Sequence, residues 1–208
     1  MAKNESLTRK KPKQSRSQVT VLSLQEAFVR VLIEQGGLDK VRVREVVEVA
    51  GVGIGTFYDY FSNLQALAAS AFRHRSESLT LRLRDTMERH RAGPWTDMVH
   101  ALLDDHIDVV LKNPKEIAGL LLIERQVFDL VSHQAFHRNF KDNWRDALLF
   151  KGMTDPLLLE TTAAMLHAIT YGWCAQEILV FRGERDRQQS RQALGLAVIG
   201  YLQAVLPK

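Results

Sequence analysis

The chain has 208 residues, of which 46% are hydrophobic and 25% are charged, a composition typical of globular proteins. It lacks the ~18 uncharged apolar residues of a membrane span, and its polar, basic N-terminus lacks the apolar segment of a signal peptide. Because Cys174 is the only cysteine, an internal disulfide is excluded, and the sequence predicts a cytoplasmic protein.

The net charge of +4 is concentrated at the N-terminus. Residues 1–17 contain six lysine or arginine residues and one glutamate, so they carry +5 and the rest of the chain carries −1. This segment includes Pro12 and has almost no apolar residues, so it cannot bury enough surface to fold alone. The sequence therefore predicts a disordered basic arm over residues 1–17.

A first helix is predicted before Gly36, which follows the last apolar residue of a helical stripe. Ser23 and Glu26 have the spacing of a capping box, which places the helix start close to them. The stripe consists of Leu24, Ala27, Phe28, Val31 and Leu32.

Residues 42–61, RVREVVEVAGVGIGTFYDYF, predict two short helices joined by a glycine turn. Val43, Val46, Val47 and Ala50 form an apolar stripe on the first helix, and a glycine follows at the position that favours a left-handed backbone. Phe57 and its neighbour four residues on can pack inward. This is the layout of a helix-turn-helix motif, whose second helix enters the major groove of DNA. The face left outward carries Ile54, Gly55, Thr56, Tyr58 and Tyr60.

A nucleotide-binding enzyme is the remote alternative for the same segment. Gly51, Gly53 and Gly55 could cradle a phosphate after a β-branched strand. However, their spacing is G-x-G-x-G rather than G-x-G-x-x-G, and no second β-rich segment follows. The helix-turn-helix is favoured because helical periodicity is present on both sides of the turn.

Other patterns typical of catalysis or metal binding are weak. The chain has no nucleophile elbow with a Ser, His, Asp order and no H-E-x-x-H motif. His133 and His137 are four residues apart, and His100, Asp104 and Asp108 share one helix face. A metal site needs three or four donors with supporting groups around them, so ordinary surface or partly buried polar residues are favoured for both sets, and we expect no metal, no cofactor and no enzyme.

Residues 16–70 resemble the N-terminal domain of the TetR family of bacterial transcriptional repressors, most specifically in the string AGVGIGTFYDYFSNLQAL. The resemblance implies base contacts from Arg44, Thr56 and the exposed face of the second helix, and a phosphate contact from Tyr58. The basic arm would lie along phosphates or in a minor groove, or else be an inert solvated tail. The residues expected to contact DNA are Arg42, Val43, Arg44, Gly53, Ile54, Gly55, Thr56, Tyr58 and Tyr60.

Three positions depart from the family pattern. Arg42 replaces the usual capping threonine, Gly53 replaces a capping serine, and Leu64 replaces a phosphate-binding lysine. Glycine is an acceptable N-cap, so the fold expectation is unaffected. The side chain at position 64 would not bind a phosphate.

Beyond residue 62 the sequence predicts a larger helical domain. Ser62 and Gln65 have capping-box spacing at the start of a long helix, which Gly93 and Pro94 end. Further helical segments reach about residue 205, so the expected fold is all-α with about nine helices. The expected domains are the arm 1–17, a helix-turn-helix domain 18–62 and a helical ligand-binding and dimerisation domain 63–208.

Each of the last two expected helices has a row of residues, spaced three or four apart, that can pack against another helix. We call this row the seam, and on the final helix its side chains are small. A seam of this kind packs within one chain or between two chains. The resemblance favours a homodimer, and its two-fold symmetry would suit a palindromic operator in double-stranded DNA. The seam residues are Leu158, Thr162, Met165, Ile169, Ala193, Ala197, Gly200 and Ala204.

A small-molecule effector is expected in the second domain, between helices spanning residues 95–173. Large apolar and aromatic residues are frequent there, although such residues are also typical of plain core. The resemblance implies a repressor whose mainly apolar ligand releases the operator, with an activator or a ligand-independent repressor as alternatives. The candidate ligand contacts are Leu102, His106, Gln126, Phe128, Trp144 and Trp173.

Overall fold

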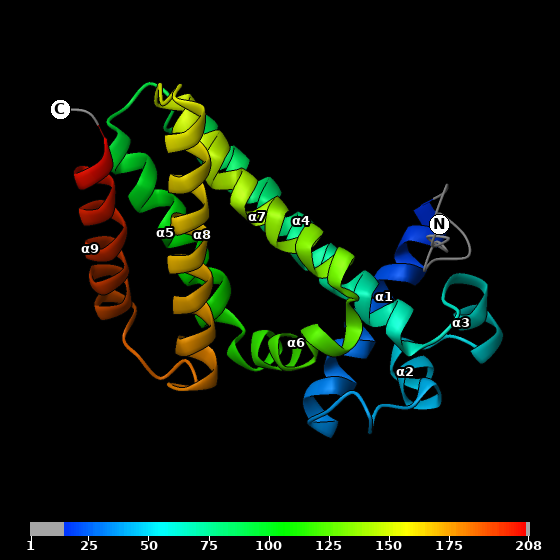
Figure 1. The fold of residues 1–208 in the computed structure, drawn as a ribbon. Helices are drawn as coiled ribbons and strands as arrows, with labels where there is room; N and C mark the ends of the chain where they lie inside the picture. The colour runs from blue at the N-terminus through cyan, green and yellow to red at the C-terminus, as the bar shows by residue number, and fades with distance from the viewer. Residues whose placement is uncertain (1–14, 207–208) are drawn as a thin grey trace. The chain divides into compact units, whose positions relative to one another are not determined.

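The computed structural model describes residues 15–206, and these form nine α-helices and no strand (Figure 1). This confirms the all-α fold. None of the helices in the described part of the chain is long and apolar enough to cross a membrane. The helices are α1 (Ser15–Gln35), α2 (Val43–Ala50), α3 (Ile54–Tyr60), α4 (Leu64–Arg89), α5 (Trp95–Lys112), α6 (Pro114–Val127), α7 (Leu130–Phe150), α8 (Pro156–Leu179) and α9 (Arg187–Val205).

The chain divides into two compact units. The first unit comprises Met1–Ser76 and Gly119–Asp129, and the second comprises Glu77–Ala118 and Leu130–Lys208. Both α4 and α6 therefore have residues in each unit. The expected domain boundary at residue 62 falls just before α4, whose first half belongs to the first unit.

The first unit is built around the buried faces of α1, α3 and the start of α4. Phe28, Phe57, Phe61 and Leu67 are all 0% exposed. The buried Gln25 side chain of α1 donates hydrogen bonds through Nε2 to Oγ of Ser70 at 2.8 Å and to its carbonyl oxygen at 3.2 Å. This contact fixes the long first helix against α4 and supports the short helices between them.

The first helix begins earlier than the sequence predicts. Because α1 starts at Ser15, the proposed capping residue Ser23 lies in the middle of the helix, and the prediction of a capping box there was wrong. The apolar stripe marks where α1 reaches the core, whereas the polar turns before it are helical without being buried. The predicted arm thus overlaps α1 at its end, and residues 1–14 lie outside the described residues.

The start of α4 is capped by a different residue from the predicted one. The backbone N–H of Ala66 donates to Oδ1 of Asn63 at 2.8 Å, so Asn63 satisfies a free amide of the first turn. The prediction that Ser62 and Gln65 form the cap was wrong by one position. Two good capping residues stand side by side here, and spacing alone does not choose between them.

The second unit is a helical layer structure in which α5 packs on α8 and α9, and α7 packs on α8 (Figure 1). Its core includes several side chains that are 0% exposed, namely Leu103, Ile107, Ala163, Leu166 and Val198. Asp155 and Asp186 cap α8 and α9, since each carboxylate accepts a hydrogen bond from a backbone amide of the first turn. The two final helices therefore start at defined positions.

A charge network joins α4, α5 and α9 within the second unit. Arg82 Nε lies 2.6 Å from Asp105 Oδ1, and Arg187 Nη1 lies 2.5 Å from Asp108 Oδ1. Burial alone would raise the pKa of Asp108, but hydrogen bonds from Lys112 and Arg82 hold that pKa below its usual value. The acidic residues of α5 thus bind basic side chains from neighbouring turns and helices.

Candidate DNA-binding surface

The first helix of the motif is held at its start by a hydrogen bond between a backbone amide and a side chain. The N–H of Arg42 donates to Oε2 of Glu45 at 3.2 Å, which satisfies an amide at the N-terminus of α2. The guanidinium of Arg42 donates to the carbonyl oxygens of Asp39 at 2.5 Å and Val41 at 3.2 Å. Arginine thus stabilises the loop before α2 where the family pattern has threonine.

The turn between α2 and α3 depends on Gly51. Its φ of 67° lies in the left-handed region, where a side chain would be strained. Gly51 N–H donates to Glu48 O at 3.1 Å and Val52 N–H donates to Val47 O at 3.0 Å, the pair of bonds that defines a Schellman motif. The predicted glycine turn is therefore confirmed in its detailed geometry.

The second helix presents one face to solvent and buries the other. Phe57 and Phe61 pack against each other with ring centroids 5.9 Å apart, and both are 0% exposed. Ile54 and Tyr58 on the outer face are 50% and 45% exposed. Of the nine candidate DNA contacts, Val43, Thr56 and Tyr60 are half-buried, and the exposed ones are Arg42, Arg44, Gly53, Ile54, Gly55 and Tyr58.

The described part of the chain gives no steric reason for glycine at position 55. A Cβ added there would have no neighbouring atom within 4 Å, and its backbone is not left-handed. Its effect is to remove side-chain bulk from the exposed face of α3. A close approach of that face to another molecule would explain this choice.

The nucleotide-loop alternative conflicts with the structure of the same segment. Val43–Ala50 is an α-helix, whereas the alternative needs a strand before the glycines. Leu64, at the position of the family's phosphate-binding lysine, is the first residue of α4 and is half-buried.

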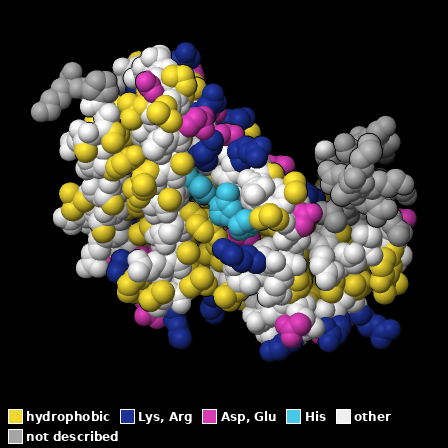
Figure 2. All heavy atoms as spheres, in the orientation of Figure 1, with side chains coloured by type: hydrophobic (Ala, Val, Ile, Leu, Met, Phe, Trp, Pro, Cys, Tyr) yellow, Lys and Arg dark blue, Asp and Glu magenta, His cyan; other side chains and the backbone are white. Residues whose placement is uncertain are grey.

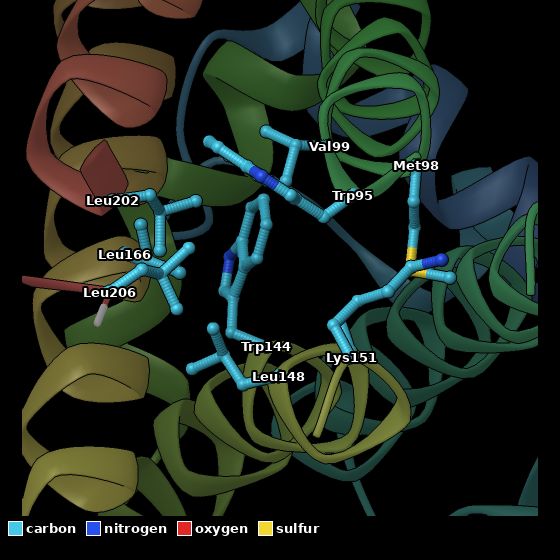
Figure 3. Close-up of a pocket in the computed structure, with 10 residues that line it drawn as sticks. Trp95, Met98, Val99, Trp144, Leu148, Lys151, Leu166, Leu202 and Leu206 are labelled. Atoms are coloured by element: carbon cyan, nitrogen blue, oxygen red, sulfur yellow. The ribbon is translucent and has the colours of Figure 1, made fainter. Parts of the chain in front are cut away.

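An apolar cavity of about 20 Å³ lies in the second unit, with room for about one water molecule (Figure 3). Lys151 is the charged residue at its wall, and its Nζ donates to three carbonyl oxygens, of His90, Arg91 and Gly93, at 2.8–3.0 Å. Figure 3 shows the indole of Trp144 in the middle of the lining. The lining residues are Trp95, Met98, Val99, Trp144, Ala147, Leu148, Lys151, Leu166, Leu202 and Leu206.

The candidate ligand contacts are divided between the two units. Trp144 lines the cavity, and Leu102, His106 and Trp173 lie elsewhere in the second unit. Gln126 and Phe128 lie in the first unit and are not among the residues that line this cavity. The other lining residues come mainly from α5, α7, α8 and α9, which are far apart in the sequence, so no local pattern marks them as one site.

The imidazole of His106 is held in one tautomer beside Trp144. Its Nδ1 lies 2.7 Å from the carbonyl oxygen of Leu102, which can only accept, so Nδ1 carries the proton. Burial lowers the pKa of His106 below its usual value, which favours the neutral ring. The ring stacks on Trp144 with centroids 5.8 Å apart. His106 therefore presents Nε2 as a hydrogen-bond acceptor.

Residues 30–71 match the family model described as bacterial regulatory proteins of the tetR family. The match covers the end of α1, the whole helix-turn-helix and the start of α4. The N-terminal domain is that of a TetR-family DNA-binding regulator. Comparison with curated protein sequences gives no significant match.

Solved structures share the TetR-like fold over nearly the whole chain. A putative transcriptional regulator from Pseudomonas aeruginosa PAO1 is 20% identical, with a TM-score of 0.73 over 92% of this chain and 93% of that one. The fatty acid degradation regulator FadR from Bacillus halodurans is 17% identical, with a TM-score of 0.74 over 93% and 99%. FadR from Bacillus subtilis, solved in complex with stearoyl-CoA, is 14% identical, with a TM-score of 0.68 over 85% and 96%.

Proposed function

We propose that this TetR-family regulator is a homodimeric repressor that binds a palindromic operator and releases it when a mainly apolar small molecule binds. The observation that carries the proposal is the exposed face of α3, which is free of side-chain bulk at Gly55 and backed by the buried Phe57 and Phe61. A rigidly backed, exposed second helix is what insertion into a major groove requires.

The outer face of α8 and α9 supports a dimer interface. Figure 2 shows hydrophobic side chains gathered over these helices. No atom of residues 15–206 lies within 4 Å of a Cβ added at Gly172 or Gly200, although glycine within a helix costs about 1 kcal/mol relative to alanine. Close approach of a second copy would explain both glycines. The exposed members of the expected interface are Met165, Ala193, Ala197, Gly200 and Ala204.

Three residues of the expected seam face their own unit to different degrees. Thr162 is 0% exposed because its side of α8 faces the core together with Leu159 and Leu166, so it lies outside a surface that a partner could reach. Leu158 and Ile169 are partly buried and pack against the same core. The proposed interface therefore runs along α9 and the outward turns of α8.

A ligand that enters the second unit at the apolar cavity would have to change its conformation. A cavity of about 20 Å³ cannot hold a metabolite, so binding would have to separate the helices around Trp144. The ligand would thus prefer an opened state, and this preference is the source of coupling to DNA. The stearoyl-CoA complex of the B. subtilis protein makes long-chain acyl compounds the first class to test. Binding of the operator only with ligand would indicate an activator, and unchanged binding would indicate a ligand-independent repressor.

The direct experiment is footprinting on the DNA upstream of the chain's own gene. We expect protection of a site with two-fold symmetry and half-sites separated by about one helical turn, ~34–36 Å. Protection of random fragments to the same degree would contradict the proposal.

Arg44 is expected to read a base. It is exposed on α2, at a position that matches base contacts in the family, and its guanidinium can donate two hydrogen bonds to a guanine. Arg44→Ala should cost about 1–3 kcal/mol of binding free energy at the operator and leave affinity for random DNA nearly unchanged. Fluorescence anisotropy with both DNAs measures this difference.

Tyr58→Phe is the matched control for Arg44→Ala. Tyr58 is 45% exposed and matches a phosphate-contacting tyrosine, so removing its hydroxyl should weaken operator and random DNA alike. An equal effect on both DNAs for Arg44→Ala would instead make Arg44 a phosphate-binding residue.

The basic arm is expected to contribute salt-dependent affinity. Residues 1–14 lie outside the described residues, and deleting them leaves α1 intact because that helix begins at Ser15. The deletion should flatten the slope of log affinity against log salt by about 0.9 for each phosphate that the arm no longer neutralises. An unchanged slope would mean that the arm is an inert tail. Leu64→Lys in the truncated chain should restore part of the affinity if the arm takes the place of the family's lysine.

A further inference from the structure

The outer face of α3 offers few groups that can hydrogen-bond to a base. This helix, Ile54–Tyr60, has the sequence IGTFYDY and contains no lysine, arginine, asparagine or glutamine. These four residue types make the bidentate hydrogen bonds by which proteins distinguish guanine and adenine in the major groove. The exposed face of α3 therefore has to read DNA in another way.

Ile54 is the apolar side chain of this face at the end where α3 begins. It is 50% exposed, and Gly55 next to it adds no side chain. No atom of residues 15–206 lies within 4 Å of a Cβ added at Gly55, so the described chain leaves that side open to close approach. The first residues of a recognition helix are the ones that contact base edges. Ile54 is thus placed to touch a base.

The polar side chains of α3 are less available at this end of the helix. Thr56 is half-buried, and Tyr58 is expected to contact a phosphate. Asp59 is exposed, but it lies five residues after Ile54, roughly 7.5 Å along the helix axis, and phosphates repel its carboxylate. The contact that α3 makes through Ile54 is therefore apolar.

We propose that Ile54 reads a thymine in each operator half-site by packing against its 5-methyl group. The inference rests on the proposed operator binding and deepens it by naming a base. Thymine is the base whose major-groove edge carries a methyl group, whereas hydrogen-bond donors and acceptors distinguish the other edges. Packing of isoleucine on this methyl group removes apolar surface of both from water, which stabilises the complex without a hydrogen bond.

The structure holds Ile54 in a defined position before DNA binds. The N–H of Phe57 donates to the carbonyl oxygen of Gly53 at 3.3 Å, which closes the first turn of α3 around Ile54. On the opposite side of the helix, Phe57 and Phe61 are 0% exposed and anchor α3 in the core. Isoleucine is branched at Cβ and has one strongly preferred χ1 rotamer in a helix, so it loses little freedom on binding.

The size of the expected effect follows from the area of one methyl group. Transfer of one such group from water to an apolar contact corresponds to about a 4-fold change in an equilibrium constant at 25 °C. An operator with two-fold symmetry has one contact of this kind in each half-site. Loss of both methyl groups should therefore weaken binding by roughly 15-fold.

The test replaces thymine by uracil in the operator that footprinting identifies. Uracil pairs with adenine as thymine does and lacks only the 5-methyl group. Each symmetric pair of thymines in the protected half-sites is replaced in turn, and fluorescence anisotropy measures the affinity of the full-length protein. We expect one pair of positions at which uracil lowers wild-type affinity by roughly 15-fold.

Ile54→Ala tests whether this side chain contacts the methyl group. The variant should bind the thymine operator more weakly than the wild type does, and should bind the thymine and uracil operators with nearly equal affinity. A double-mutant cycle of protein and DNA measures this coupling. Equal preference for thymine in Ile54→Ala and the wild type would overturn the proposal, since the methyl group would then act through another residue or through the shape of the DNA.

Val49→Ala is the matched control for Ile54→Ala. Val49 is also branched at Cβ and is 39% exposed, but it lies on α2 and is not among the expected DNA contacts. This variant should keep the full preference of roughly 15-fold for thymine. Loss of the preference in Val49→Ala as well would overturn the assignment to Ile54.

Two results separate a failure of this inference from a failure of the proposed function. If the protein protects an operator but uracil at every thymine pair leaves its affinity unchanged, the thymine contact is overturned and operator binding stands. If no operator is protected, the proposed function and the inference both fail. Because Ile54 is 50% exposed, Ile54→Ala should denature close to the wild-type urea concentration, and this measurement separates a lost contact from unfolding.

Discussion

Phe57→Ala is expected to lower the free energy of unfolding of the first unit by about 3–5 kcal/mol, the usual cost of removing a buried phenylalanine ring. The ring is 0% exposed and contacts Phe61 behind the outer face of α3. Since a small domain has only about 5–15 kcal/mol of stability, α3 should lose its support and operator binding should be abolished. Urea denaturation and anisotropy with operator DNA measure the two effects.

Ile54→Ala is the control on the same helix. Ile54 is 50% exposed, so its truncation should change stability by less than about 0.5 kcal/mol while still altering DNA binding. If Phe57→Ala denatures at the wild-type urea concentration, the ring does not support α3 as the structure indicates.

Ala197→Arg is expected to convert the protein from a dimer into a monomer. Ala197 is exposed on α9 among small residues, and an arginine there would place a bulky charge between two closely approaching helices. A monomer binds one half-site at a time, so operator affinity should fall by roughly 10²–10⁴-fold because avidity disappears. Analytical ultracentrifugation and anisotropy measure both changes.

Leu81→Arg provides the matched control for the dimer variant. Leu81 is 62% exposed on α4, outside the proposed interface, so this arginine should leave the dimer and the operator affinity unchanged. If Ala197→Arg remains dimeric at the concentrations used for DNA binding, the α9 surface is not the dimer interface.

Patterns repeated within one helix were enough to predict the motif. The stripe on residues 43–50, the glycine after it and the pair Phe57 and Phe61 all reflect local periodicity, and the structure has the helices where these patterns place them. Helix starts were predicted less well. α1 starts at Ser15, because the turns before its apolar stripe are helical too, and Asn63 rather than Ser62 caps α4, because both are good capping residues.

Sites formed between distant segments were not predictable from spacing. The cavity around Trp144 is closed by Leu166 and Leu202 from the last two helices, and the imidazole of His167 reaches His137 across two helices. Each of these contacts depends on how one helix packs on another. A single sequence shows which residue types are present, but it does not show which residues of distant helices contact each other.

Coupling between a ligand and operator affinity tests the central proposal most directly. Long-chain acyl-CoA and fatty acids would be screened for a rise in melting temperature, which at 100 times the dissociation constant corresponds to about 2.7 kcal/mol of added stability. A compound that stabilises the protein should weaken operator binding, measured by anisotropy, by roughly 5–150-fold, because linkage between the two sites is reciprocal. Ligand-induced stabilisation with unchanged operator affinity would contradict the proposal and leave the second unit as a dimerisation scaffold.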